Sequence, residues 1–152
     1  MNNIEKIWQD LHAIPEPAFK EIKTSQYLAT YLRKLGYQVQ DGLTPSHTGI
    51  LATLDSGKKG PLVGLRSDMD CLIFAENNKE VPIHACGHDG HMSMVLAAAE
   101  ALAQSPLKKG QVKIVFQPAE EIGLGAKAML STGLLDDLDY LFGVHLMPKE
   151  LA

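Results

Sequence analysis

HACGHDGHM, residues 84–92, places three of the chain's six histidines, one of its two cysteines and an aspartate within nine positions. Residues 92–104 follow as MSMVLAAAEALAQ, and this nearly all-apolar run predicts a well-buried helix from His88 to about Gln104. A Cys-x-His step just before a helix brings a thiolate and an imidazole out of one loop, an arrangement that suits a metal ion. The stretch therefore predicts a metal-binding loop in front of a buried helix.

Segments on both sides of this stretch alternate between helix and strand patterns. Apolar residues at helical spacing, or short runs between glycines, predict further helices over residues 3–14, 21–35 and 123–133. Apolar runs bounded by turn residues predict strands over residues 37–40, 47–55, 61–70, 112–121 and 139–148. The polar segment 72–83 is expected to be a loop. The alternation predicts an α/β fold, a layered sheet flanked by helices, with no internal domain boundary.

Composition and charge exclude several classes of protein. The chain has 152 residues, 45% of them hydrophobic, which is enough for a real core. Its net charge of −4 gives no sign of nucleic-acid binding. The amino terminus lacks the apolar core of a signal peptide, and no apolar run is long enough to span a membrane. Because two cysteines make no disulfide framework, we expect a cytoplasmic protein in a reducing environment, with no nucleic-acid or membrane partner.

Candidate metal ligands recur where the predicted strands end. Besides the pair in the loop, Cys86 and His88, they are Asp68, Asp70, Glu120, Glu121 and His145. Ligands of parallel-sheet proteins gather at the carboxyl ends of the strands, so we expect these side chains at one edge of the sheet. Thiolate, imidazole and carboxylate together suit zinc, manganese, cobalt or nickel, whereas calcium prefers oxygen ligands only.

The adjacent carboxylates of Glu120 and Glu121 predict a division of labour. Neighbouring side chains of an extended strand point in opposite directions, but at a strand end the chain can turn both toward one pocket. One carboxylate can then bind a metal while the other takes a proton from the water that the metal activates. This arrangement is typical of metal-assisted amide hydrolysis.

Each of these residues also has a structural interpretation. His145 between apolar neighbours, taken alone, is more often structural, and a lone pair of glutamates is more often a solvated surface pair. Asp68 alone could cap a helix or a turn, and His84 could be a hydrogen-bond partner within its loop. Cys71 reads as a small buried residue. The metal interpretation gains weight because the groups support one another.

The sequence resembles the M20 metallopeptidases, in the branch of amidohydrolases that includes aminoacylases, hippurate hydrolases and auxin-conjugate hydrolases. The matching segments occur in the family's order and cover nearly the whole chain. They are LHAIPEPAFKE at 11–21, GLRSDMD at 64–70, HACGHDGHM at 84–92, VFQPAEEIGLGAKAML at 115–130 and FGVHLMP at 142–148. The resemblance implies a zinc-exopeptidase-like catalytic domain.

Roles for individual residues follow from the resemblance. Glu120 resembles the family's general base and acid. The residues that resemble its metal ligands are Cys86, His88, Glu121 and His145. Asp68 matches an aspartate below the metal site that would orient a ligand, and Asp89 and His91 match supporting residues. The family's site holds two divalent metal ions, with the cysteine sulfur able to bridge them.

Family members are much longer than 152 residues. The resemblance implies that residues 1–152 are the amino-terminal segment of the catalytic domain, incomplete at its carboxyl-terminal side. We expect the lid or dimerisation domain, and a further histidine ligand, to be absent from this chain. A sheet cut before its last strands would leave an open edge, so we expect self-association through that edge.

The sequence therefore predicts a metal-dependent amidohydrolase that cleaves the amide bond of N-acyl amino acids or small peptides. Two alternatives stay open. The chain could be a truncated α/β fragment without catalytic activity that binds metal weakly or not at all. It could also be a structural zinc module, although mixed carboxylate ligands and a spare Glu120 argue against a closed tetrahedral site.

Overall fold

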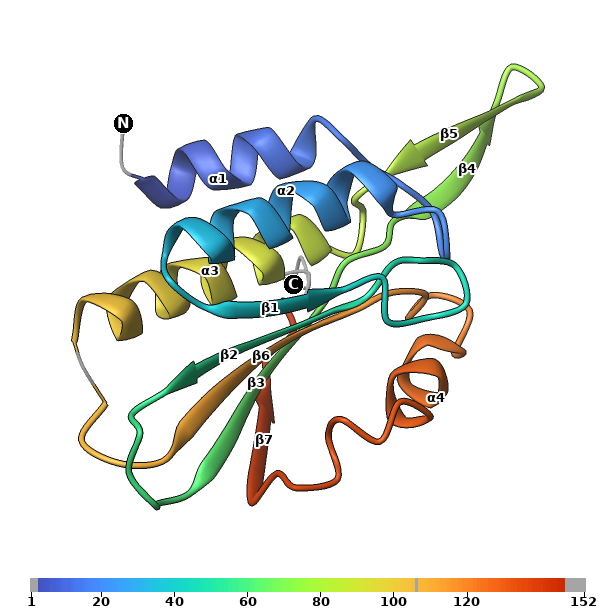
Figure 1. The fold of residues 1–152 in the computed structure, drawn as a ribbon. Helices are drawn as coiled ribbons and strands as arrows, with labels where there is room; N and C mark the ends of the chain where they lie inside the picture. The colour runs from blue at the N-terminus through green and yellow to red at the C-terminus, as the bar shows by residue number, and fades with distance from the viewer. Residues whose placement is uncertain (1–2, 106, 147–152) are drawn as a thin grey trace, which may run out of the picture.

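The computed structural model describes residues 3–105 and 107–146, which form a mixed five-stranded sheet flanked by helices (Figure 1). The sheet contains β1 (Gln38–Asp41), β2 (Ile50–Asp55), β3 (Leu62–Asp68), β6 (Gln111–Gln117) and β7 (Tyr140–Gly143). The helices are α1 (Asn3–His12), α2 (Ile22–Lys34), α3 (His88–Gln104) and α4 (Gly125–Leu130). This arrangement confirms the predicted α/β fold.

The strand order is β1-β2-β6-β3-β7, in which β3 runs parallel to both of its neighbours, β6 and β7. β1 and β2 are antiparallel, and β2 is also antiparallel to β6. In the parallel part, Asp68 lies opposite Gln117, and Arg66 lies opposite Gly143. The carboxyl ends of β3, β6 and β7 therefore share one edge of the sheet, as the sequence predicts.

Helices α1, α2 and α3 cover one face of the sheet and enclose the main core (Figure 1). Apolar side chains one helical turn apart, such as Leu28 and Leu32 on α2, point inward and are fully buried. They meet alternate residues of the central strand β6, including Ile114 and Phe116. The predicted buried helix α3 begins at His88 and lies against β3 and β6, so the core fixes where the nonapeptide lies.

The opposite face of the sheet carries a smaller apolar cluster under α4. Leu51 and Val115 pack there with Met129. β7 forms the edge of the sheet beyond β3, and its side chains Tyr140, Leu141 and Phe142 are each more than half exposed. The predicted strand over 139–148 is thus shorter in the structure, and its last two residues lie outside the described part of the chain.

The segment 72–83, which the sequence predicts as a loop, is instead a β-hairpin, so that prediction is wrong. Strands β4 (Leu72–Glu76) and β5 (Lys79–Ile83) pair antiparallel and project from the body of the molecule (Figure 1). Asn77 and Asn78 connect them with φ angles of 50° and 60°. Asparagine tolerates this left-handed conformation, and two such residues form the tight turn that hairpins prefer.

No helix in residues 3–105 and 107–146 combines the length and the apolar character needed to cross a membrane. Both cysteines are free thiols, and Cys71 is buried, as predicted. The cytoplasmic location stays a prediction.

Candidate metal centre

The candidate site lies where the parallel strands end. Asp68 is the last residue of β3, and Glu120 follows the end of β6 by a short turn. His145 follows β7, and Gly87, in the left-handed conformation with φ of 79°, turns the chain sharply between Cys86 and α3. Four separate segments of the sequence thus converge at one edge of the sheet.

His88 is the central residue of the site and is fully buried. Its Nδ1 lies 2.9 Å from the backbone oxygen of Asp70 and 3.5 Å from the Asp70 carboxylate. A proton on Nδ1 would be donated to that oxygen, which leaves the lone pair of Nε2 free for a ligand. Nε2 faces the carboxylates of Glu120 and Glu121 at 3.8 and 3.9 Å.

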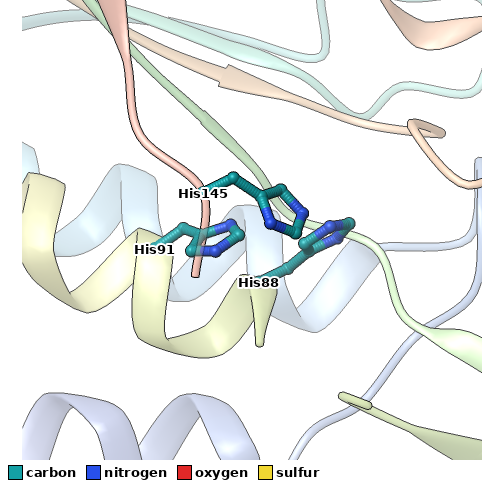
Figure 2. A group of neighbouring side chains, drawn as sticks. All are labelled: His88, His91 and His145. Carbon is teal, nitrogen blue, oxygen red and sulfur yellow. The ribbon is translucent and has the colours of Figure 1, made fainter. Parts of the chain in front are cut away.

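Two groups of potential ligand atoms meet at His88, and within each group all atoms lie within 4.8 Å of one another. Cys86, His88 and Glu121 form the first group, which contains three of the four predicted ligands. His88, His91 and His145 form the second. Figure 2 shows His88 and His91 extending from α3 and His145 approaching from the segment after β7. The structure therefore brings His145 close to His88, but it pairs it with His91 rather than with Cys86 and Glu121.

The unpartnered atoms of the first group fit a cation. Nε2 of His88 and Oε1 of Glu121 are buried and have no hydrogen-bond partner. A buried lone pair and a buried carboxylate oxygen that face each other are costly unless a proton or a positive ion lies between them. A thiol, an imidazole and a carboxylate are also the donors that zinc and similar metals prefer. The residues present therefore fit a divalent transition metal.

The two adjacent glutamates differ in exposure. The side chain of Glu120 is 40% exposed, whereas that of Glu121 is 14% exposed. Both carboxylates face His88 because the chain turns at Ala119, which has a left-handed φ of 54°. The buried carboxylate is therefore suited to hold a metal, and the more exposed one to exchange a proton with water.

Asp70, rather than Asp68, contacts the candidate ligands. Besides its contacts with His88, Asp70 accepts a hydrogen bond of 3.0 Å from the backbone N–H of Glu121. Asp68 is buried and forms an ion pair with Arg66 instead. Burial raises the pKa of Asp68 to about 6, although the positive charge of Arg66 opposes this shift. The strand-end position in the sequence predicted both Asp68 and Asp70 as candidates, and the structure assigns the contacts with the ligands to Asp70.

Hydrogen bonds, nearby charges and burial shift the pKa values of Cys86 and His88 in the first group. The hydrogen bond to Glu121, followed by burial and by nearby carboxylates, raises the pKa of Cys86 to about 11. Burial lowers the pKa of His88, but the hydrogen bond to Asp70 and the charges of Asp68 and Asp70 outweigh it, so the net shift is upward. A divalent cation would reverse both effects, because thiolate and neutral imidazole are the ligand forms.

The supporting residues lie around α3. Asp89 is buried and lies 2.6 Å from Nδ1 of His12, so it links α3 to α1. His91 accepts the backbone N–H of Leu146 at its Nε2, at 2.7 Å. Burial, together with the neighbouring rings of His88 and His145, lowers the pKa of His91 to about 4. His84 is also buried, and neither of its ring nitrogens has a partner.

Comparison with known proteins identifies the family of the chain. The sequence pattern of peptidase family M20/M25/M40 matches residues 64–152, which is more than half of the chain. The chain belongs to this family. The hippurate hydrolase of Campylobacter jejuni is 41% identical over 95% of this chain and 39% of its own length. Thermostable carboxypeptidase 1 of Saccharolobus solfataricus is 39% identical over 94% of this chain and 39% of its own length.

A solved structure gives the same fold. The Bacillus subtilis YXEP protein, a dinuclear metal-binding peptidase from the M20 family, matches with a TM-score of 0.87 and 32% identity. The match covers 96% of this chain and 43% of that chain. The chain of this M20 protein therefore spans about two fifths of the length of these relatives. The comparison confirms the family and the fold that the motifs predict.

Proposed function

We propose that this M20 protein is a metal-dependent amidohydrolase that cleaves the amide bond of N-acyl amino acids or small peptides. The observation that carries the proposal is the convergence of Cys86, His88 and Glu121, with the more exposed Glu120 beside them. The similarity to a hippurate hydrolase and a carboxypeptidase supports this class of substrate.

Two divalent metal ions are part of the proposal, which the similarity to a dinuclear M20 peptidase supports. The residues that would hold them are Cys86, His88, Glu121 and His145. When bound, the metals would activate a water molecule and polarise the amide carbonyl. Zinc, manganese, cobalt and nickel all suit this donor set.

Glu120 is proposed as the general base and acid. Its carboxylate would take a proton from the attacking water and later deliver a proton to the leaving nitrogen of the amide. Its exposure lets it meet a substrate, while its position 3.8 Å from Nε2 of His88 keeps it beside the ligands.

The remaining residues of the site would act through the ligands. Asp70 holds the backbone of Glu121 and Nδ1 of His88, so it would orient both ligands. We propose that Asp68, which is paired with Arg66, acts through its negative charge on His88, whose pKa it helps to raise. Asp89 and His91 would fix the start of α3 and the segment after β7 through their contacts with His12 and Leu146.

A second candidate is that residues 1–152, as the amino-terminal segment of an M20-type catalytic domain, do not catalyse on their own. The exposed apolar side chains of β7 favour it, because an open parallel edge offers unpaired backbone groups and apolar surface to another strand. In that state we expect the chain to self-associate through β7. Sedimentation of the wild type beside Phe142→Lys should show the wild type as the larger species, and monomers for both would contradict this expectation.

Turnover of N-acetyl and N-benzoyl amino acids with added manganese or zinc tests the two candidates. Hydrolysis by the 152-residue chain that stops on addition of a chelator would support the amidohydrolase proposal directly. Hydrolysis only by a form extended to the length of the relatives would favour the second candidate, in which residues 1–152 alone are inactive. Absence of hydrolysis from both forms, with every acyl group and metal, would contradict the proposed function.

A further inference from the structure

Glu21 is a buried carboxylate that the proposed chemistry does not use. It precedes α2, far from the glutamate pair in sequence, and its side chain is fully buried. Its Oε1 accepts two backbone hydrogen bonds of 2.9 Å, one from the N–H of Phe19 and one from the N–H of Ala119. Its other oxygen, Oε2, is buried without a hydrogen-bond partner. A single oxygen thus ties the amino-terminal segment to the turn after β6.

Both donors have a strained backbone. Phe19 has a φ of 61° and Ala119 a φ of 54°, and neither is a glycine. Residues with a Cβ atom adopt this left-handed conformation only where surrounding contacts enforce it, and such residues cluster at functional sites. For Ala119, the hydrogen bond from its N–H to Glu21 is one of those contacts.

Further hydrogen bonds of the turn come from segments other than the amino-terminal one. The N–H of Glu121 donates to Asp70, and the backbone oxygen of Ala119 accepts from Leu124 and Gly125. A Cβ atom at Gly125 would lie 1.5 Å from the backbone oxygen of Pro118, so α4 packs directly against the turn. Of these contacts, only the one to Glu21 links Ala119 to the amino-terminal segment.

We propose that Glu21 is a positioning residue that fixes the turn at residues 118–121 so that Glu120 and Glu121 face His88. The inference rests on the proposed function of those two glutamates. Burial raises the pKa of Glu21. Both the carboxylate and the carboxylic acid offer Oε1 as an acceptor for the two N–H groups. We therefore assign the positioning of the turn to the acceptor oxygen, and Glu21→Gln, which keeps an acceptor without the charge, tests this assignment.

Two variants of similar length separate the acceptor from the volume of the side chain. Glu21→Gln keeps an oxygen that can accept from Phe19 and Ala119, whereas Glu21→Met fills the space without a strong acceptor. Glu16→Met is the matched control. Glu16 lies in the same segment, and its carboxylate accepts the N–H groups of Lys23 and Thr24, at 3.1 and 2.9 Å, rather than a group of the turn.

The first measurement is amide hydrogen exchange of the metal-free protein. In Glu21→Met, residues 117–124 should exchange about tenfold faster than in the wild type, because the loss of one buried hydrogen bond allows local opening. Glu21→Gln and Glu16→Met should keep the wild-type exchange of this segment. Wild-type exchange of residues 117–124 in Glu21→Met would overturn the inference, and this result does not depend on metal binding or catalysis.

The second measurement is the affinity for Co²⁺, followed by the absorption band of the thiolate bound to cobalt. Loss of a residue that orients ligands typically costs about 10–100-fold in metal affinity, so Glu21→Met should bind Co²⁺ that much more weakly. Glu21→Gln should bind nearly as tightly as the wild type, and so should Glu16→Met. Equal affinity of Glu21→Met and Glu16→Met would count against positioning. A wild type that binds no Co²⁺ would count against the proposed function, and hydrogen exchange alone would then decide the role of Glu21.

Discussion

On one side of His88, Glu121 lies in a turn that buried carboxylates hold in place, and Cys86 lies just before the buried helix α3. On the other side, His145 lies in an exposed segment beyond the edge strand. Asp70 accepts the N–H of Glu121, and Glu21 accepts the N–H of Ala119. His145 is exposed, and its Nδ1 lies 2.7 Å from the backbone oxygen of the next residue. The first side is anchored to buried residues, while the second depends on a sheet edge with exposed apolar side chains.

This difference indicates which half of the site is preorganised. Ligands whose orientation is fixed by buried hydrogen bonds lose little freedom when a metal binds. Ligands on an exposed segment lose conformational freedom when the metal binds, and this cost reduces the affinity for the metal. We therefore expect a metal to bind first between Cys86, His88 and Glu121.

The largest expected effect concerns the chemistry on the preorganised side. In a catalytically active form, Glu120→Gln should lower kcat by about 10²–10⁴-fold, because the side chain of glutamine cannot take a proton from the attacking water. Its metal content, measured by elemental analysis, should stay at the wild-type level. A variant with full activity would show that Glu120 is not the base.

Ligand substitutions compare the two sides directly. Cys86→Ser should lower the affinity for Co²⁺ by more than about 100-fold, since it removes a ligand rather than its support. His145→Gln should have a clearly smaller effect on the first ion bound. Titration of both variants with Co²⁺ checks the order, and a greater loss in His145→Gln would reverse the comparison.

The next largest effect concerns Asp70, which supports the ligands on the preorganised side. Asp70→Ala should weaken Co²⁺ binding by about 10–100-fold, because it frees the N–H of Glu121 and removes the charge beside His88. Asp55→Asn is the control, since Asp55 contacts Gln111 at the opposite end of β6 and lies away from the ligands. If the two variants bound Co²⁺ equally, Asp70 would have no special role.

The smallest effect concerns the histidines on the second side. The pKa of His91 in the folded protein is about 4, below its ordinary value of 6.5. Between these values the unfolded chain binds a proton that the folded chain does not, so the free energy of unfolding falls as the pH is lowered through this window.

His91→Gln cannot take up that proton. The pH dependence of its stability should therefore be flatter than that of the wild type, by at most about 1.4 kcal/mol per pH unit. Urea unfolding of both proteins between pH 4 and pH 6.5 measures this difference. Parallel curves would mean that His91 titrates normally.

Much of the fold could be predicted because local patterns determine it. The apolar run after His88 predicts α3, which spans His88–Gln104. The hairpin at 72–83 was missed because its polar centre, ENNKE at 76–80, is typical of a loop. The signal that favours a hairpin is the apolar run at 72–75 before the Asn77–Asn78 turn. The order of the strands depends on long-range pairing, which no local pattern contains.

The site shows the same limit at the level of single residues. Spacing and strand ends predicted that Cys86, His88 and Glu121 would come together. Which of Asp68 and Asp70 contacts them depends on the backbone just after β3, where strand periodicity no longer applies. The contact of Glu21 with Ala119 joins residues that are far apart in sequence, so only the structure could reveal it.

The most direct test of a preorganised metal centre at Cys86 is X-ray absorption at the zinc edge of the zinc-loaded protein. We predict one sulfur neighbour at about 2.3 Å beside nitrogen and oxygen neighbours at about 2.0–2.2 Å, with the sulfur lost in Cys86→Ser. A shell of nitrogen and oxygen alone, unchanged in Cys86→Ser, would contradict the account.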